Sequence, residues 1–415
     1  MDRTERGTDT FAALRFPAYR RLWFSGLAVF MAVNGQTVAR GWLARDITGS
    51  NAGLGGVFLG FGIAMLLATP FGGVAADRLP KRAIIAAAQL LIGLSSLWIG
   101  LAVQFDFVEY WMLIVASALQ ALAFAFYGPA RVAFTAELVE GGDVSNAIVL
   151  VQVSAESMRI IGPTMAGAMI GAATWGLASV FLASAALCTL GAMISLTVPH
   201  GKPAANREPR SPLAELRDGL HYVRHRRDLS LLVACSLGVV IVGWPYMAFM
   251  PTIADGIFSE GSTGYGLLSA ASALGAVTAG LLVASRGNRH EPWKLATVGG
   301  MGLGGCLILL AVTPVFVSAM LVVVAAGASM LMFQTTVNSL LLGLSDFEYH
   351  GRIQSLVMLG FSGFGIVALP IGLLADTIGL RATLALMGAT IIGIMSVFAA
   401  RRRRYRTIEL LSDLG

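Results

Sequence analysis

The sequence predicts an all-α integral membrane protein with twelve transmembrane helices in two pseudo-symmetric six-helix bundles. Three observations lead to this prediction. Of the 415 residues, 56% are hydrophobic and only 13% are charged, and the mean hydropathy is +0.75, far above the value of a soluble protein. Apolar runs of about 20 residues, each long enough to cross a hydrocarbon core of roughly 30 Å, recur along almost the whole chain. The basic residues gather in alternate loops.

Each apolar run is expected to be a helix, because backbone groups in lipid must be satisfied within the segment and the runs lack the alternating pattern of a barrel strand. The first run follows several arginines and no small-residue cleavage site, so we expect it to remain as a helix. In chain order, the predicted spans are 20–44, 52–75, 83–104, 110–137, 145–171, 175–198, 229–254, 264–285, 293–313, 316–343, 353–375 and 379–400.

The distribution of basic residues predicts the orientation. Nearly all of the 29 lysines and arginines fall in the N-terminal tail, the even-to-odd loops, the central polar segment and the C-terminal tail. Arg40, Arg45 and Arg381 are expected on the opposite side, and Arg159 inside the membrane. The positive-inside rule then predicts a plasma (bacterial inner) membrane protein with both termini cytoplasmic. The net charge of +6 therefore reflects topology, and no nucleic-acid partner is expected.

The longest polar stretch divides the chain into two halves. We predict an N-terminal six-helix bundle at residues 1–199, a cytoplasmic linker with an amphipathic helix at 200–228, and a C-terminal bundle with a basic tail at 229–415. The linker helix is expected either to lie on the anionic leaflet or to be a solvated tether. Matches such as Arg78 with Arg286 and Pro163 with Pro370, at a nearly constant offset, indicate a duplicated unit. Repeated bundles are typical of transporters with a substrate site near the midplane.

The fifth predicted span contains an unusual polar stripe. Gln152, Glu156, Arg159 and Pro163 are three or four residues apart and therefore share one helix face. An unpaired charge at the bilayer centre costs roughly 3 kcal/mol, so the two charges are expected to pair. Two interpretations remain open. The pair either stabilises helix packing, or it faces a central cavity, where Arg159 anchors cargo and Glu156 titrates.

Other polar residues at membrane depth are candidates for the same cavity. Each of them has an alternative role in bonding or packing against a neighbouring helix. They are Asn34 and Gln36 in the first span, Gln120 and Tyr127 in the fourth, Trp244 and Tyr246 in the seventh, and Gln334 and Asn338 in the tenth.

Neither a cofactor, a metal site nor an enzymatic reaction is expected. All five histidines fall in predicted cytoplasmic loops, and the three cysteines fall in separate spans. The only Gly-Lys pair, Gly201-Lys202, lacks the spacing of a phosphate-binding loop. We expect a monomer.

The segment "GGVAADRLPKR", residues 72–82, resembles the loop motif of the major facilitator superfamily, with Pro80 in place of a glycine. The resemblance extends over essentially the whole chain and implies the major facilitator fold. It also implies a cytoplasmic gate between the halves. The alternative for the members near the end of the fourth span is a solvated helix end. The expected gate residues are Asp77, Arg78, Lys81, Arg82, Arg131 and Glu137.

Within the superfamily, "NGQTVARGWLARDITGS", "GPARVAFTAELV", "RIIGPTMAG" and "GLLADTIGLRAT" look like the branch that contains the enterobactin exporter and macrolide efflux proteins. The superfamily's span-four arginine, associated with proton coupling in antiporters, aligns with Ser117, while Gln120 is retained. Coupling through an arginine at that position is therefore not expected. Branch members commonly have Asn where this chain has Glu156.

These observations predict a secondary active transporter that exports an amphipathic small molecule, of the drug or siderophore type, by alternating access. The expected partners are the small-molecule substrate, protons as coupling ion and the lipid bilayer. A metabolite importer or facilitator of the same fold is an alternative. A membrane sensor is a further alternative, against which the absence of a long soluble segment argues.

Overall fold

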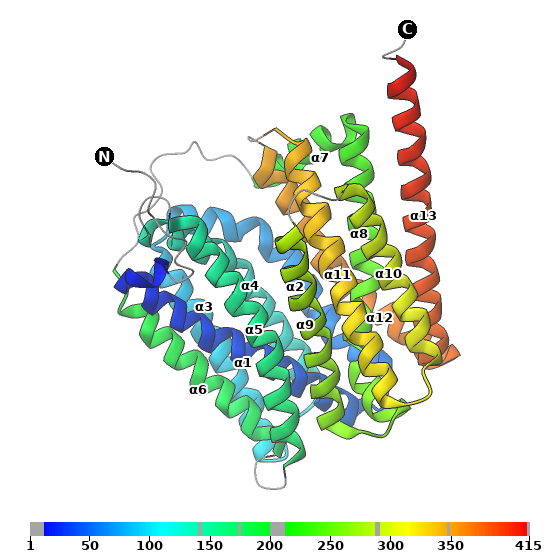
Figure 1. Cartoon of the computed structure of the whole chain (residues 1–415). Coiled ribbons are helices and arrows are strands. Elements are labelled where there is room, and N and C mark those ends of the chain that lie inside the picture. The colour runs from blue at the N-terminus through cyan, green and yellow to red at the C-terminus, as the bar shows by residue number, and fades with distance from the viewer. Residues whose placement is uncertain are drawn as a thin grey trace. The chain divides into compact units, whose positions relative to one another are not determined.

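The computed structural model describes residues 12–139, 143–172, 176–199, 212–286, 291–346 and 349–412, and these ranges contain helices and no strand. Figure 1 shows the helices as long rods. The first is a short 3-10 helix, Ala12–Arg15. The α-helices are α1 (Pro17–Thr48), α2 (Asn51–Arg78), α3 (Lys81–Gln104), α4 (Tyr110–Leu138), α5 (Val144–Gly171), α6 (Gly176–Leu196), α7 (Pro212–His225), α8 (Arg227–Gly243), α9 (Gly261–Arg286), α10 (Pro292–Val312), α11 (Phe316–Leu344), α12 (His350–Ile378) and α13 (Leu380–Ser412).

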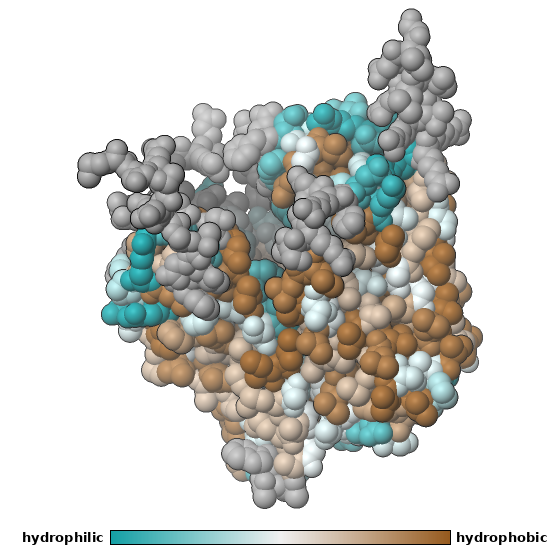
Figure 2. Space-filling view, viewed as in Figure 1, coloured by the Kyte–Doolittle hydropathy of each residue, from teal (hydrophilic) through white to brown (hydrophobic). Residues whose placement is uncertain are grey.

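Eleven helices within the described ranges are long and apolar enough to cross a membrane. Together with α5, they correspond to the twelve predicted spans, so the all-α prediction is confirmed. α5 has 28 residues but is not among the eleven, and Gln152, Glu156 and Arg159 make its sequence more polar. Figure 2 shows apolar side chains over most of the visible helix surfaces, with the hydrophilic residues near helix ends.

The chain forms two compact units. Unit 1 comprises Met1–Leu43 and Ala64–Pro209, and unit 2 comprises Ala44–Ile63 and Arg210–Gly415. The last turn of α1 and the first half of α2 thus belong to unit 2, although the rest of both helices belongs to unit 1. The predicted segment boundaries at 199 and 228 did not include this exchange, which depends on contacts distant in sequence.

A buried hydrogen-bond network joins three helices of unit 1. The amide of Gln89 on α3 donates to Ser25 Oγ on α1 over 2.7 Å and accepts from Ser195 Oγ on α6 over 3.0 Å. The two serine oxygens lie 2.7 Å apart, and Ser25 also donates to the Gly191 carbonyl oxygen. Because each buried polar group has a partner, the network costs little desolvation energy and fixes the register of the three helices.

Small residues set the closest helix contacts of unit 2. α9 and α11 pack side by side, and a Cβ added at Gly275 would lie 1.8 Å from the Val324 carbonyl oxygen. A Cβ added at Gly327 would lie 1.9 Å from the Ser272 carbonyl oxygen. The two backbones can approach this closely only because neither position has a side chain.

The seventh predicted span, 229–254, is not one continuous α-helix. α8 ends at Gly243, a 3-10 helix follows at Trp244–Met247, and a π-helical turn occupies Thr252–Ile257. Pro245 and Pro251 lack the amide hydrogen that a continuing α-helix needs, which explains the break. Short 3-10 and π turns inside a span often mark functional hinges.

The predicted linker helix is α7, and it packs against α8 and α12. The ring of Tyr222 stacks on Tyr349 with centroids 3.8 Å apart and an interplanar angle of 7°. Its hydroxyl donates to Asp346 Oδ2 over 2.9 Å, and Arg226 Nη1 donates to the Leu344 carbonyl oxygen over 3.1 Å. α7 is thus packed within unit 2, a role that neither predicted interpretation included. Residues 200–211 of the predicted linker lie outside the described residues.

Candidate functional site

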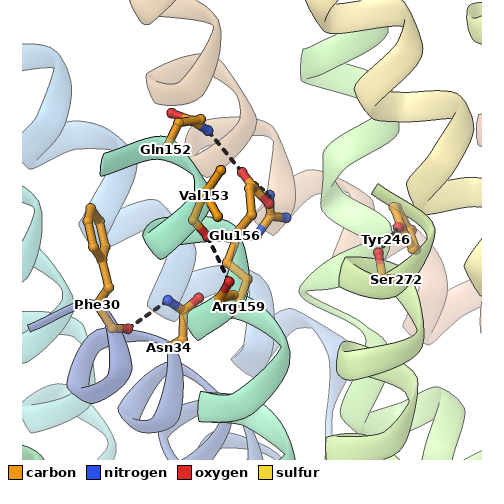
Figure 3. A network of polar contacts seen from close by, with 9 residues as sticks. Phe30, Asn34, Gln152, Val153, Glu156, Arg159, Tyr246 and Ser272 are labelled. Atoms are coloured by element: carbon orange, nitrogen blue, oxygen red, sulfur yellow. Dashed lines mark hydrogen bonds and ion pairs between the residues drawn. The ribbon is translucent and has the colours of Figure 1, made fainter. Parts of the chain in front are cut away.

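The polar stripe of α5 forms a connected group in unit 1 (Figure 3). Arg159 Nη1 lies 3.1 Å from Glu156 Oε2 and 3.5 Å from Oε1, and Gln152 Nε2 donates to Oε1 over 3.1 Å. The side chains of Glu156 and Arg159 are 16% and 28% exposed. The carboxylate therefore accepts from two neighbouring side chains of its own helix, and the opposite charges reduce each other's cost in the membrane.

α5 is placed by a close contact with α1. A Cβ added at Gly162 would lie 2.9 Å from Asn34 Cβ and 3.1 Å from the Met31 carbonyl oxygen. α5 continues through Pro163. Asn34 thus lies where the two helices meet, and its Nδ2 donates to the Phe30 carbonyl oxygen of its own helix over 2.7 Å (Figure 3).

A second polar group of unit 1 lies between α1 and α4. Arg40 was expected within the first span, toward the side opposite the termini, and in the structure it lies on α1 and is only 4% exposed. Its Nη1 donates to Ser117 Oγ over 2.9 Å, and its Nη2 donates to Gln120 Oε1 over 2.8 Å. Although residue 117 is serine, a guanidinium group from α1 contacts it.

Arg40 Nε and the side-chain amide of Gln36, one turn earlier on α1, are buried. Neither group has a hydrogen-bond partner within the part of the chain that the structure describes. Gln36 is fully buried. Such groups are rare in native structures, because a buried polar atom without a partner costs free energy.

Tyr127 lies in the packed core of unit 1 and is 2% exposed. Its ring centroid is 6.0 Å from that of Phe124 and 6.5 Å from that of Phe30. The Arg131 guanidinium, also buried, lies over the Phe30 ring at 4.7 Å, within the range of a cation–π interaction.

Among the expected gate residues, Lys81 and Glu137 form an ion pair of 2.6 Å. The side chain of Lys81 is 3% exposed and that of Glu137 is 33% exposed. Arg82 Nη1 donates to the carbonyl oxygens of Leu196 and Val198, each over 3.1 Å. Arg78 is exposed, and the side chain of Asp77 lies outside the described residues.

The candidates in unit 2 are distributed over the broken seventh span and α11. Tyr246 Oη lies 3.0 Å from Ser272 Oγ of α9 (Figure 3). Trp244 contacts the rings of Phe361 and Phe364 of α12. On α11, Asn338 Oδ1 accepts from Gln354 Nε2 over 2.6 Å. Gln334, also on α11, is half-buried.

A carboxylate that the sequence did not single out caps the start of α2 within unit 2. Asp376 of α12 accepts from the backbone amides of Asn51 and Ala52, each over 2.8 Å, and from Asn51 Nδ2 over 2.9 Å. These bonds satisfy otherwise unpaired amides at the start of α2, where the helix dipole also favours negative charge. The two partners are 325 residues apart, so no local pattern predicts the contact.

Within the described ranges, no three histidine, cysteine, aspartate or glutamate side chains are close enough to hold a metal ion.

Two bacterial proteins are similar to this chain over most of their length. An uncharacterised MFS-type transporter of Bacillus subtilis (strain 168), YfiS, is 24% identical over 382 residues, which cover 84% of this chain and 85% of that protein. The staphyloferrin A transporter of Staphylococcus aureus (strain NCTC 8325 / PS 47) is 22% identical over 358 residues, which cover 83% of this chain and 86% of that protein.

Solved transporter structures have the same fold. The nucleoside transporter NupG has a TM-score of 0.73 at 14% identity, with 92% of this chain and 98% of that chain covered. A bacterial homologue of the human lysosomal transporter Spinster, in an inward-facing and unoccupied conformation, also has a TM-score of 0.73, at 15% identity, with 95% and 96% covered. The family model of the Major Facilitator Superfamily matches residues 22–368, most of the chain, and this multi-pass membrane protein therefore belongs to the Major Facilitator Superfamily.

Proposed function

We propose that this chain is a proton-coupled secondary active transporter that exports an amphipathic small molecule of the drug or siderophore type. The observation that carries the proposal is the Glu156–Arg159 pair, two opposite charges in a membrane-depth helix with a nitrogen–oxygen distance of 3.1 Å. Ionisable residues at membrane depth are expensive and usually mark transport pathways. The similarity to a staphyloferrin A transporter supports the siderophore class of cargo.

Glu156 is the proposed proton-carrying group. Its carboxylate accepts from Arg159 and Gln152. Protonation removes the charge that pairs with Arg159, and the guanidinium then interacts with cargo. The same carboxylate cannot hold a proton and a full ion pair at once, so proton binding and cargo binding become linked.

The remaining candidates have proposed roles in the same cycle. Asn34, Trp244, Tyr246, Gln334 and Asn338 are proposed to contact cargo as the two units alternate in access. The gate proposal is carried by the Lys81–Glu137 pair, because a buried ammonium needs its carboxylate. We also propose a cytoplasmic location for both termini, in agreement with the basic residues of both tails.

An importer or facilitator of a metabolite is the second candidate. It is favoured by one observation, the serine at position 117, where the resembling antiporters have an arginine on the same helix. In this alternative, the Glu156–Arg159 pair only stabilises α5, and no proton moves with the cargo.

Transport in proteoliposomes with an imposed pH gradient separates the two candidates. The cargo panel contains cationic drugs and catecholate siderophores, and the central variant is Glu156→Gln. Glu291→Gln is a matched control, because Glu291 pairs with Lys294 at the same three-residue spacing but is 46% exposed. An exposed pair of this kind contributes little.

We expect gradient-driven transport to fall by about tenfold in Glu156→Gln, in accordance with the loss of a group that carries the proton. Exchange of cargo without a gradient is expected to continue in that variant, and Glu291→Gln is expected to behave as wild type. If the gradient drives transport equally in wild type and Glu156→Gln, Glu156 is not the coupling group and the facilitator candidate is preferred.

A further inference from the structure

Arg40 is a buried permanent cation whose hydrogen bonds end on neutral groups. Its two contacts are Ser117 Oγ and Gln120 Oε1 on α4. The guanidinium cannot be relieved by deprotonation, because arginine remains protonated in proteins. Within the part of the chain that the structure describes, no carboxylate forms an ion pair with it.

Two other cations of unit 1 have carboxylate partners. The buried Lys81 pairs with Glu137, and the half-buried Arg159 pairs with Glu156. A buried charge that has only neutral partners retains much of its desolvation cost, since hydroxyl and amide oxygens carry no full negative charge. The charge of Arg40 is therefore not neutralised by an anionic side chain of the described residues, and a bound anion would stabilise it.

Two donors near the guanidinium remain unused and belong to one helix face. Arg40 Nε and Gln36 Nε2 are buried and without partners in the described residues, as is the acceptor Gln36 Oε1. Gln36 and Arg40 are four residues apart on α1, so their side chains project from the same face, one turn apart. Ser117 and Gln120 already hold the two terminal nitrogens, which leaves the Nε edge of the guanidinium as the available edge.

We infer that Arg40 and Gln36 form an anion-binding subsite for a carboxylate group of the transported molecule. A carboxylate matches the planar guanidinium, because two oxygens accept from one of its edges, and a side-chain amide supplies a further donor. The inference rests on the proposed transport function and narrows its cargo. The molecule carries at least one carboxylate, which excludes purely cationic drugs.

The subsite is closed in the structure described here, since Gln36, Arg40, Ser117 and Gln120 are all at most 5% exposed. A transporter that works by alternating access exposes its binding groups in only part of the cycle. The carboxylate therefore enters in another conformation. Once bound, it replaces the missing counter-ion and stabilises the folded protein.

The experiment measures the thermal unfolding midpoint of the full-length protein in an uncharged detergent, by tryptophan fluorescence. The probes are acetate, succinate and citrate, each against its neutral methyl ester at equal ionic strength. The variants are Arg40→Gln, Arg40→Lys and Gln36→Leu. Arg45→Gln is the matched control, because Arg45 lies on the same helix and donates to the exposed carbonyl oxygen of Gly49.

We expect at least one of the three acids to raise the midpoint of wild type by about 1 °C or more, with a saturable concentration dependence, while its ester has no effect. The effect is expected in Arg45→Gln and absent in Arg40→Gln. Arg40→Lys keeps the charge but loses the planar edge, so its half-saturation concentration is expected to be about tenfold higher.

The inference is overturned if none of the acids raises the wild-type midpoint, or if Arg40→Gln responds as wild type does. Should Arg40→Gln not fold, the wild-type and Arg40→Lys measurements still decide the question. The outcome is separable from that of the transport proposal. A proton-coupled exporter of uncharged cargo would lose gradient-driven transport in Glu156→Gln, as proposed. The wild-type protein would then show no stabilisation by carboxylates.

Discussion

Glycine-to-alanine substitution is expected to have opposite effects at Gly275, in the contact between α9 and α11, and at Gly305 on α10. An alanine Cβ at position 275 would lie 1.8 Å from the Val324 carbonyl oxygen, whereas real Cβ contacts are essentially never shorter than 3.0 Å. The helices must therefore separate by about 1.2 Å, the difference between these two distances. At Gly305 on α10, nothing lies within 4 Å of an added Cβ.

The expected cost of Gly275→Ala is about 2 kcal/mol. Overpacking costs typically about 1 to 3 kcal/mol, and backbone atoms cannot rotate away, so the upper end applies. The higher helix propensity of alanine stabilises the folded protein by up to about 1 kcal/mol and offsets part of this cost. In Gly305→Ala, where nothing is overpacked, this stabilisation is the only effect expected. With an unfolding entropy of roughly 2 cal/mol/K per residue, the midpoint is expected to fall by about 2 °C in Gly275→Ala and to rise by about 1 °C in Gly305→Ala.

Thermal unfolding of the purified protein in detergent, followed by tryptophan fluorescence, measures both shifts under identical conditions. Gly327→Ala is a second test, because its Cβ would lie 1.9 Å from the Ser272 carbonyl oxygen on the other side of the same contact. If Gly275→Ala is as stable as Gly305→Ala, the two helices do not approach as closely as described, and the reasoning from backbone contact fails.

Three further substitutions have expected outcomes. Glu137→Gln removes the carboxylate that pairs with the buried Lys81. After allowance for the partial exposure of Glu137, the expected loss is about 1 to 2 kcal/mol, which lowers the thermal unfolding midpoint by about 1 to 2 °C. An unchanged midpoint would argue against the ion pair. Asp376→Ala removes the cap of α2, including the bond from Asn51 Nδ2. The free energy of unfolding, measured by chemical denaturation, is expected to fall by about 1 to 2 kcal/mol. A smaller fall in Asp376→Asn would show how much of the loss is due to the charge. Tyr222→Ala removes the stack that docks α7, so trypsin is expected to cleave that helix about tenfold faster, and equal rates would contradict the docking.

Hydropathy predicted the helices because a membrane imposes a single length scale on every span. The break in the seventh span was missed for the same reason. Trp244, Tyr246 and their neighbours are apolar enough to continue the hydrophobic run, and hydropathy does not register that Pro245 removes a backbone donor. The docking of α7 was missed because its contacts with Tyr349 and Asp346 depend on tertiary packing rather than on amphipathicity.

In the candidate site, too, some contacts could be predicted from the sequence and others could not. The Glu156–Arg159 pair could be predicted because both residues lie on one helix, where spacing alone decides which side chains meet. Arg40 could not, because Ser117 is 77 residues away and the contact depends on the register of α1 against α4. Hydropathy places Arg40 within the first span but does not show which residues of the neighbouring helix it contacts.

The two arginines Arg159 and Arg40 have different proposed roles. Arg159 already pairs with a carboxylate of its own chain, and that carboxylate is the group proposed to carry the proton. Arg40 holds only neutral oxygens and so remains attractive to an external anion. The proposals therefore predict separable variants. Glu156→Gln should lose coupling to the pH gradient and keep stabilisation by carboxylates, and Arg40→Gln should lose that stabilisation while leaving the proton-carrying group intact. If one substitution abolished both properties, proton and cargo would share a single site, and the division would be wrong.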